Sequence, residues 1–233
     1  MTTKQAIDFL AKDSLIHVDM LESIVRGNSE ILQATDQGVL LFDTVCGTYM
    51  MSTEDEKTAS RMISTVKHAD LFVAHQNFYI DAVQNKFMLH DETMCYQAAY
   101  FKKEPLPVPN STAVIRGLDE SYLPFVLEHY SHMDDEEYVL DRLKSGAMFG
   151  AFVEDRLVGF IGSHAEGSMG MLEVLPEYRR QGFAVALETF LTNHFLAEGY
   201  IPYAQIIVDN SASLKLHHKL NFSISNQTIC WLT

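Results

Sequence analysis

The chain has few cysteines and few basic residues, and each shortage narrows what the protein can be. Its 233 residues include three widely spaced cysteines, Cys46, Cys95 and Cys230, with no C-x-x-C pair. This usage is typical of reduced core thiols in a cytoplasmic protein rather than of a disulfide framework. Only 17 residues are Lys or Arg while 31 are Asp or Glu, and the net charge is −14. That balance argues against broad contact with nucleic acid or with an anionic membrane surface.

Long apolar runs are lacking as well. No stretch of about 18 apolar residues is present, which argues against a membrane-spanning helix. Lys4, Asp8, Lys12 and Asp13 interrupt any run that would resemble a signal peptide. We therefore expect a soluble, cytoplasmic protein. Hydrophobic residues make up 47% of the chain and charged residues 21%, which is typical of a globular protein of one large or two small domains.

A proline-rich segment divides the chain. Three prolines occur within residues 105–109, and they disfavour a helix and favour an extended connector. The sequence therefore predicts an N-terminal α/β domain over residues 1–104, a linker over 105–110 and a second domain over 111–233. The acidity is shared, with net charges of −6 for residues 1–110 and −8 for 111–233.

The first half reads as α/β and carries no residues that indicate chemistry. Hydrophobic periodicity and turn residues predict its elements in chain order. They are a helix or helical pair over 5–26, a hairpin of strands 39–42 and 48–51, a capped helix beginning at Ser52 or Thr53, a strand at 71–74, a helix at 77–87 and a strand at 94–101.

The second half follows the order β-α-α-β-β-β-α-β-α-β. Its predicted elements are a strand at 112–116, helices at 119–130 and 134–143, strands at 148–153, 157–163 and 169–175, a helix at 182–197, a strand at 203–208, a helix at 211–220 and a strand at 224–232. A tight turn at 154–156 joins two of the strands into an antiparallel pair. We expect a mixed, mostly antiparallel sheet flanked by helices.

One turn in this half favours an anion. The strand predicted at 169–175 runs into Pro176-Glu177-Tyr178-Arg179-Arg180-Gln181-Gly182-Phe183-Ala184, and a helix begins there. A helix start offers free N–H groups and a positive dipole end, and arginines add charge-assisted hydrogen bonds. Four of the eight basic residues of the second half are Arg179, Arg180, Lys215 and Lys219, which predicts a local anion site on an acidic protein. A merely solvated turn is the alternative.

These residues resemble the GNAT superfamily of acyl-CoA-dependent N-acyltransferases. The family signature R/Q-x-x-G-x-G/A reads here as Arg179 to Ala184, after the lead-in V-x-P-E-Y-R at Val174 to Arg179. A second signature, N-x-x-S-x-x-L-(Y)-x-K-L-G-F, is matched from Asn210 to Phe222. The resemblance covers roughly residues 112–233. More weakly, the pairing of the two halves resembles glycine N-acyltransferase-like proteins, which implies that the first half is a degenerate copy of the fold.

The resemblance implies a binding site for coenzyme A. The amides of residues 180–184, with Arg179 and Arg180 beside them, would hold its pyrophosphate; these amides belong to Arg180, Gln181, Gly182, Phe183 and Ala184. Leu172 and Val174 would pair with the pantetheine arm through the backbone of a splayed strand and polarise the thioester carbonyl. Ordinary core packing is the alternative for both.

Two residues of the second signature have roles implied in the same way. Asn210 resembles the residue whose amide binds the pantetheine arm, and Ser213 resembles a contact on the phosphate side. An Asx turn that caps the next helix is the alternative for Asn210, and helix capping is the alternative for Ser213.

Amine acylation requires a base and benefits from an acid. A free amine is protonated at neutral pH, so a base must remove a proton before attack, and an acid can protonate the departing thiolate. The base candidates are Glu173, Glu166 and His164, on or beside the central strands. His217 stands where the family commonly has a tyrosine acid, and it is either that acid or a helix residue without a chemical task. The ten histidines show no metal-ligand spacing, so no metal is expected.

The sequence thus predicts an enzyme that transfers an acyl group, expected to be acetyl, from acyl-CoA to a primary amine of a small molecule. The resemblance implies direct attack without a covalent enzyme intermediate, and a monomer or homodimer is expected. The alternative is an acyl-CoA-binding sensor or scaffold with weakened chemistry, supported by His217. A nucleotide-phosphate site is disfavoured because no G-K-[ST] follows the loop.

Overall fold

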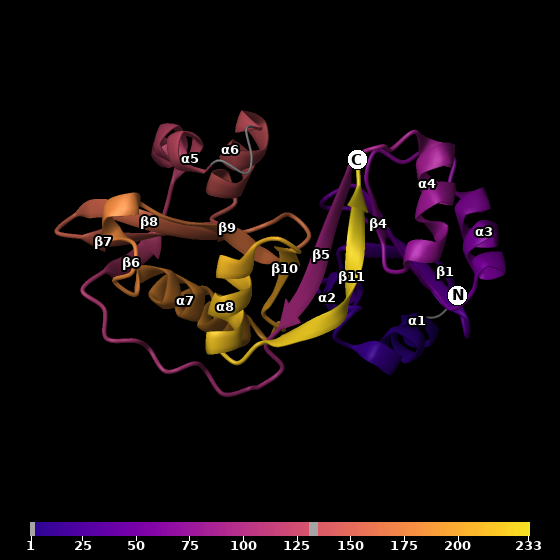
Figure 1. Ribbon diagram of the computed structural model, residues 1–233, viewed down its shortest axis with the longest axis horizontal. Coiled ribbons are helices and arrows are strands. Elements are labelled where there is room, and N and C mark those ends of the chain that lie inside the picture. Colours follow the sequence, from indigo (N-terminus) through magenta and orange to yellow (C-terminus); the bar gives the residue numbers. More distant parts are fainter. Residues whose placement is uncertain (1–2, 131–134) are drawn as a thin grey trace.

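One sheet runs through both halves of the protein (Figure 1). The structure, a computed structural model, describes residues 3–130 and 135–233, and over these residues the sheet has eleven strands in the order β1-β2-β3-β4-β11-β5-β10-β9-β8-β7-β6. The strands are β1 (Ser29–Thr35), β2 (Gly38–Asp43), β3 (Thr48–Thr53), β4 (Phe72–Ala74), β5 (Glu92–Ala99), β6 (Val114–Gly117), β7 (Met148–Val153), β8 (Arg156–Ser163), β9 (Met169–Val174), β10 (Tyr203–Ile207) and β11 (Ser223–Leu232).

Helices cover both faces of the sheet. They are α1 (Thr3–Leu10), α2 (Val18–Val25), α3 (Glu56–Thr65), α4 (Ile80–Phe87), α5 (Leu123–His129), α6 (Glu136–Lys144), α7 (Phe183–Glu198) and α8 (Ser211–Lys219). Around β7, β8 and β9, α5 and α6 lie on one face while α7 and α8 lie on the other (Figure 1). In the other half, α3 and α4 pack on one face and α1 and α2 on the opposite one. Each face thereby buries its own apolar cluster.

The last strand interlocks the two halves. β11 lies between β4 and β5 and is antiparallel to both, with Trp231 opposite Val73 on one side and Thr93 on the other. β5 in turn pairs with β10, so strands from residues 1–104 and from 111–233 alternate at the centre of the sheet. The chain between β5 and β6 runs along the outside of the second half (Figure 1). The division at 105–110 stays a prediction, because the sheet is continuous across it.

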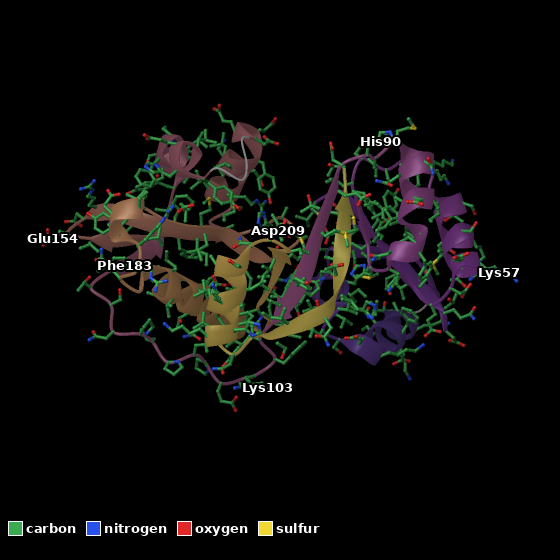
Figure 2. The ribbon with its side chains drawn as sticks, in the orientation of Figure 1. Lys57, His90, Lys103, Glu154, Phe183 and Asp209 are labelled. Carbon is green, nitrogen blue, oxygen red and sulfur yellow. The ribbon has the colours of Figure 1, made fainter. Side chains whose placement is uncertain are left out.

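Most of the predicted elements are confirmed, including the hairpin of β2 and β3 and the full order of the second half. The tight turn between β7 and β8 has two residues in left-handed backbone, Glu154 with φ 49° and Asp155 with φ 62°. This is the conformation that a two-residue hairpin loop requires, because it matches the strand twist. Glu154 lies at the outer tip of the second half (Figure 2).

The predicted helix start at Ser52 or Thr53 is wrong. Both residues belong to β3, where Thr53 pairs with Gly38 of β2. The helix begins instead at Glu56, because Asp55 takes the extended backbone of an N-cap and accepts the N–H of Thr58 at 2.8 Å.

Two further differences concern a strand that was not predicted and the start of a helix. β1 was not predicted, since its residues are mostly half-buried and show no clean alternation. Asp134, the predicted start of the next helix, lies outside the described residues, and α6 is capped by Asp135. Within the described part, no helix is both long and apolar enough to cross a bilayer.

Candidate active site

The site lies where two parallel strands separate. β9 and β10 share a single register pair, Met169 with Ala204. Beyond it, β9 continues along β8 and β10 continues along β5. Met171 has left-handed backbone (φ 50°), and the register of β8 against β9 shifts between Phe160 and Gly162. This bulge bends β9, and a cleft of about 1650 Å³ opens at this place.

The turn after β9 presents unused backbone donors at this cleft. Arg180 and Gly182 have left-handed backbone, with φ of 64° and 91°. Gly182 is the N-cap of α7 and provides no side-chain cap. Over the described residues, no hydrogen bond is made by the N–H groups of residues 180–185, and the first one in the helix is from Ala186 to Gly182, at 3.0 Å. Free N–H groups at a helix start form an anion-binding site.

The left-handed backbone at position 182 requires a glycine. A positive φ strains any residue with a Cβ, although the space beside Gly182 is open for 4 Å. Phe183 begins α7 and Asp209 follows β10, and both are labelled in Figure 2, which shows the two segments that carry the sequence motifs. Phe183 and Ala184 line the cleft.

The two arginines of the turn differ in their contacts. Arg179 donates from Nε to the carbonyl of Val174 and from Nη2 to Glu173 Oε1, both at 3.0 Å. The same carboxylate oxygen accepts the N–H of Val174 at 3.0 Å. Arg179 therefore fixes the end of β9, whereas Arg180 is exposed and has no ion pair among the described residues.

The other predicted cofactor residues are also located. Leu172, Val174, Asn210 and Ser213 all line the cleft. The side chain of Asn210 caps α8 by accepting the N–H of Ser213 at 3.0 Å, so the Asx-turn alternative is present in the structure. Gln181 is not among the lining residues, and its side chain donates to the carbonyl of Glu177 at 3.0 Å.

His217 is buried in the wall of the cleft against a carboxylate. Its Nε2 lies 3.2 Å from Glu188 Oε1 of α7, and both side chains are under 5% exposed. Its Nδ1 lies 2.9 Å from the carbonyl oxygen of Ser213. Burial is the largest single effect and lowers the pKa of His217, but the nearby Glu188 carboxylate and the Ser213 carbonyl together outweigh it, so the pKa is raised overall.

Sequence reasoning missed Glu188. A signal was present, because Glu188 falls on the same helical stripe as Ala184, Leu191 and Phe195, which pack in the core. A carboxylate on a buried stripe is rare unless it is paired.

The three base candidates also line the cleft. Glu173 is held by Arg179 as described. Glu166 is buried and accepts a hydrogen bond from the Ser168 hydroxyl, and it has no ion pair with a cation in the part that the structure describes. His164 Nδ1 lies 3.0 Å from the hydroxyl of Tyr138.

The first half supplies a second wall. Cys46, Thr48, Thr93 and Cys95 line the same cleft, together with Trp231 of β11. Burial raises the pKa of the Cys46 and Cys95 thiols to about 12, so both are protonated at neutral pH. No group of three or more His, Cys, Asp or Glu arranged to hold a metal occurs within residues 3–130 and 135–233.

Comparison with known proteins agrees with this geometry. Residues 113–222 match the model of the Acetyltransferase (GNAT) family, and this part of the chain is a GNAT acetyltransferase domain. No curated protein matches the chain in sequence.

Solved structures extend the likeness over the whole chain. A Drosophila melanogaster protein superposes with a TM-score of 0.72 at 12% identity, covering 98% of this chain and 94% of its own. A GCN5-related N-acetyltransferase from Kribbella flavida gives 0.58 at 12% identity, covering 94% of each chain. An acetyltransferase of the GNAT family from Colwellia psychrerythraea gives 0.54 at 13% identity, covering 94% of this chain and 97% of its own. At these identities the likeness establishes the fold, a mixed α/β arrangement with a mostly antiparallel sheet.

Proposed function

We propose that the protein transfers an acyl group, expected to be acetyl, from acyl-CoA to a primary amine of a small molecule. The family and the fold support acyl transfer from acyl-CoA in general. The observation that carries the proposal is the set of free N–H groups at residues 180–185 beside the cleft between β9 and β10. A pyrophosphate fits such a set of donors, and Arg180, which has no ion pair among the described residues, adds a positive charge.

The acyl arm extends from that turn along the open edge of β9 in this proposal. Backbone groups of Leu172 and Val174 are the expected partners of the pantetheine arm. The thioester carbonyl then lies near the N–H of Val174, which polarises it in an oxyanion-type contact once Glu173 releases that N–H.

The amine attacks the thioester directly in this proposal. The raised pKa values of Cys46 and Cys95 support this, because a protonated thiol is a poor nucleophile for a covalent intermediate. Among the base candidates the contacts favour Glu166, since Glu173 Oε1 already accepts hydrogen bonds from Arg179 and Val174. The walls supplied by the first half are the expected acceptor pocket.

Thiol release from acetyl-CoA in the presence of a panel of amines tests the proposal. We expect turnover with at least one small primary amine. Glu166→Gln is expected to lower kcat by about 10²-fold or more, and Glu173→Gln to lower it less. The reverse order would assign the base to Glu173.

The second candidate is an acyl-CoA sensor or scaffold. It is favoured by one observation, the burial of His217 against Glu188 at the position where the family commonly has a tyrosine. Saturable binding of CoA by calorimetry, with no thiol release for any amine, would favour the sensor over the enzyme.

A further inference from the structure

An arginine of the first half lies behind the turn that carries Glu166. Residues 164–168 join β8 to β9, and the Glu166 side chain is buried there in the wall of the cleft. Arg26 is the C-cap of α2 and is not among the residues that line the cleft. A Cβ at position 167, where the chain has Gly167, would lie 2.8 Å from Arg26 Nη1 and 2.9 Å from its Cζ. The guanidinium is therefore in close contact with the backbone of the turn, one residue after Glu166.

Arg26 is held on its other sides as well. Its Cζ lies 4.2 Å from the ring centre of Tyr200 and 4.9 Å from that of Phe195, and both rings belong to the second half. Its Nε donates to Glu22 Oε2 of α2 at 3.4 Å, and the Glu22 side chain is buried. A flat guanidinium that lies over two rings and beside a buried carboxylate has little freedom to move. Its contact with Gly167 is therefore rigid.

Stability alone does not explain this arrangement. Arg26 Nη2 is buried and has no hydrogen-bond partner within the described residues. A buried donor without a partner costs free energy, and an apolar side chain of similar size would fill the same space without that cost. Such a group calls for an explanation, and the segment that the guanidinium contacts is the turn of the proposed base.

Two tyrosines hold the same turn from the second half. The Tyr203 hydroxyl donates to the carbonyl of Glu166 at 2.9 Å, and the Tyr138 hydroxyl accepts the N–H of Ala165 at 3.2 Å. Tyr203 is fully buried in β10, and Tyr138 belongs to α6. Together with Arg26, side chains from three segments fix the backbone on both sides of the Glu166 side chain.

We propose that Arg26 is a positioning residue through which the first half of the protein holds Glu166 in place to take the proton of the attacking amine. This inference rests on the proposed acyl transfer and gives the first half a part in its chemistry. A base works only within hydrogen-bond reach of the proton that it removes, and a misplacement of about 1 Å costs up to about 10²-fold in rate. The contact of Arg26 with Gly167 prevents such a displacement.

Arg26→Lys tests the contact without leaving Glu22 unpaired. The lysine keeps the charge but has no flat group to lie against Gly167, so the exchange is not conservative at this site. We expect kcat to fall by about tenfold or more, with KM for acetyl-CoA unchanged, because the proposed donor site at residues 180–185 is a different segment. Arg116 of the edge strand β6 is the matched control, since its Cζ lies 4.0 Å from a ring centre and it is not among the cleft-lining residues. Arg116→Lys is expected to leave kcat unchanged.

The same contact can be changed from the side of the turn. Gly167→Ala places a Cβ against the guanidinium and strains a backbone with φ of 98°. Gly146 also has positive φ, 74°, but nothing lies within 4 Å of its Cβ position, so Gly146→Ala introduces the strain without the clash. We expect Gly167→Ala to lower kcat by about tenfold or more and Gly146→Ala to lower stability alone. Equal kcat values for the two variants would contradict a role for the contact with Arg26.

A double variant separates positioning from a purely structural role. If Arg26 acts through the Glu166 carboxylate, then Arg26→Lys lowers kcat by less than about threefold once Glu166→Gln has removed that carboxylate, because groups that act as a unit are not additive. A loss of folded protein would instead lower the rate by the same factor in both backgrounds. An undiminished effect of Arg26→Lys in the Glu166→Gln background would overturn the proposal.

A further measurement needs no turnover. The N–H groups of Ala165 and Gly167 are hydrogen-bonded within the protein, so their exchange with solvent, followed by NMR, reports on the turn. We expect Arg26→Lys to speed both exchanges by about tenfold relative to the amides of α7, and Arg116→Lys to leave them unchanged. Unchanged exchange in Arg26→Lys would overturn the proposal. Failure of the proposed function is distinguishable, because it appears as absent thiol release in the wild type, whatever the exchange rates are.

Discussion

Each half of the protein buries a histidine against a carboxylate, and the two pairs differ in how completely they are satisfied. In the first half, His75 Nε2 lies 2.9 Å from Asp19 Oδ1 with both side chains fully buried. Asp19 also accepts the N–H of Met20 at 2.8 Å and the amide of Gln205 at 3.2 Å. In the second half, His217 and Glu188 leave Nε2 and Oε1 without hydrogen bonds, within the residues described.

The difference separates a closed polar network from a pair that is incompletely satisfied. The Asp19 network joins α2 of the first half to Gln205 of β10, which in turn accepts from Trp231 of β11 at 2.7 Å. This network holds the strands from the two halves together. Asp19 and His75 are not among the residues that line the cleft. Glu188 and His217 are among the residues that line the cleft, although Oε1 and Nε2 are themselves buried. A complete polar network makes a core rigid, whereas an incomplete one leaves capacity for a ligand.

The largest expected effect is on stability. Asp19→Ala leaves a buried histidine and Gln205 without their partner, and breaking such a pair costs about 3–5 kcal/mol. Glu188→Ala is expected to cost less, because both residues line the cleft and removal of the Glu188 side chain opens His217 to water from it. Urea unfolding of both variants measures the two losses. A larger loss of stability for Glu188→Ala than for Asp19→Ala would contradict the contrast drawn between the two pairs.

The next effect is the pH dependence of stability, which has opposite signs in the two halves. Burial lowers the pKa of His17 to about 4. The unfolded chain then binds a proton near pH 6.5 before the folded protein does. We expect up to about 3 kcal/mol of stability to be lost between pH 6.5 and 4, and His17→Gln to flatten that slope.

For His217 the pKa is raised in the folded protein. Its contribution to the free energy of unfolding is therefore fully present below the pKa of the histidine in the unfolded chain, and it is lost as pH rises through the pKa in the folded protein. His217→Gln is therefore expected to flatten the alkaline side of the stability curve. Unfolding curves from pH 4 to 9 measure both slopes. If His17→Gln leaves the acid slope unchanged, the lowered pKa of His17 is contradicted. If His217→Gln leaves the alkaline slope unchanged, the raised pKa of His217 is contradicted.

A smaller effect distinguishes the two arginines of the turn. Arg180→Ala removes an exposed cation that is free to meet phosphate, and a charge-assisted hydrogen bond contributes about 1.5–3 kcal/mol. We expect Kd for CoA to rise about tenfold or more, with a weaker salt dependence. Arg179→Ala releases Glu173 and the end of β9, so it is expected to lower kcat more than affinity. Calorimetry in low and high salt tests this, and equal losses of affinity would remove the distinction.

The sequence was sufficient where the signals are local. Gly182 after two arginines indicated a helix start with free donors, and Asn210 at the head of a helical pattern indicated a cap; both features are present, while their roles toward coenzyme A stay predictions. The place of β11 between β4 and β5 was not predictable, because pairing of residues distant in the chain has no local signature. The contact of Glu188 with His217 was missed for the same reason, although a carboxylate on a buried stripe was a readable signal.

The smallest expected effect compares one helix cap in each half. Asn210 caps α8 at the cleft, and Asp55 caps α3 far from it, through the N–H groups of Ser213 and Thr58. Removing either side chain as Asn210→Ala or Asp55→Ala is expected to lower Tm by about 2–4 °C, because a cap supports the first turn of its helix. Only Asn210→Ala is expected to raise KM for acyl-CoA as well, since its amide is the proposed partner of the pantetheine arm. Thermal unfolding and initial rates measure both. If Asn210→Ala lowers Tm and leaves KM unchanged, then the amide only caps the helix, and the binding of acyl-CoA in this cleft depends on the turn at residues 180–185.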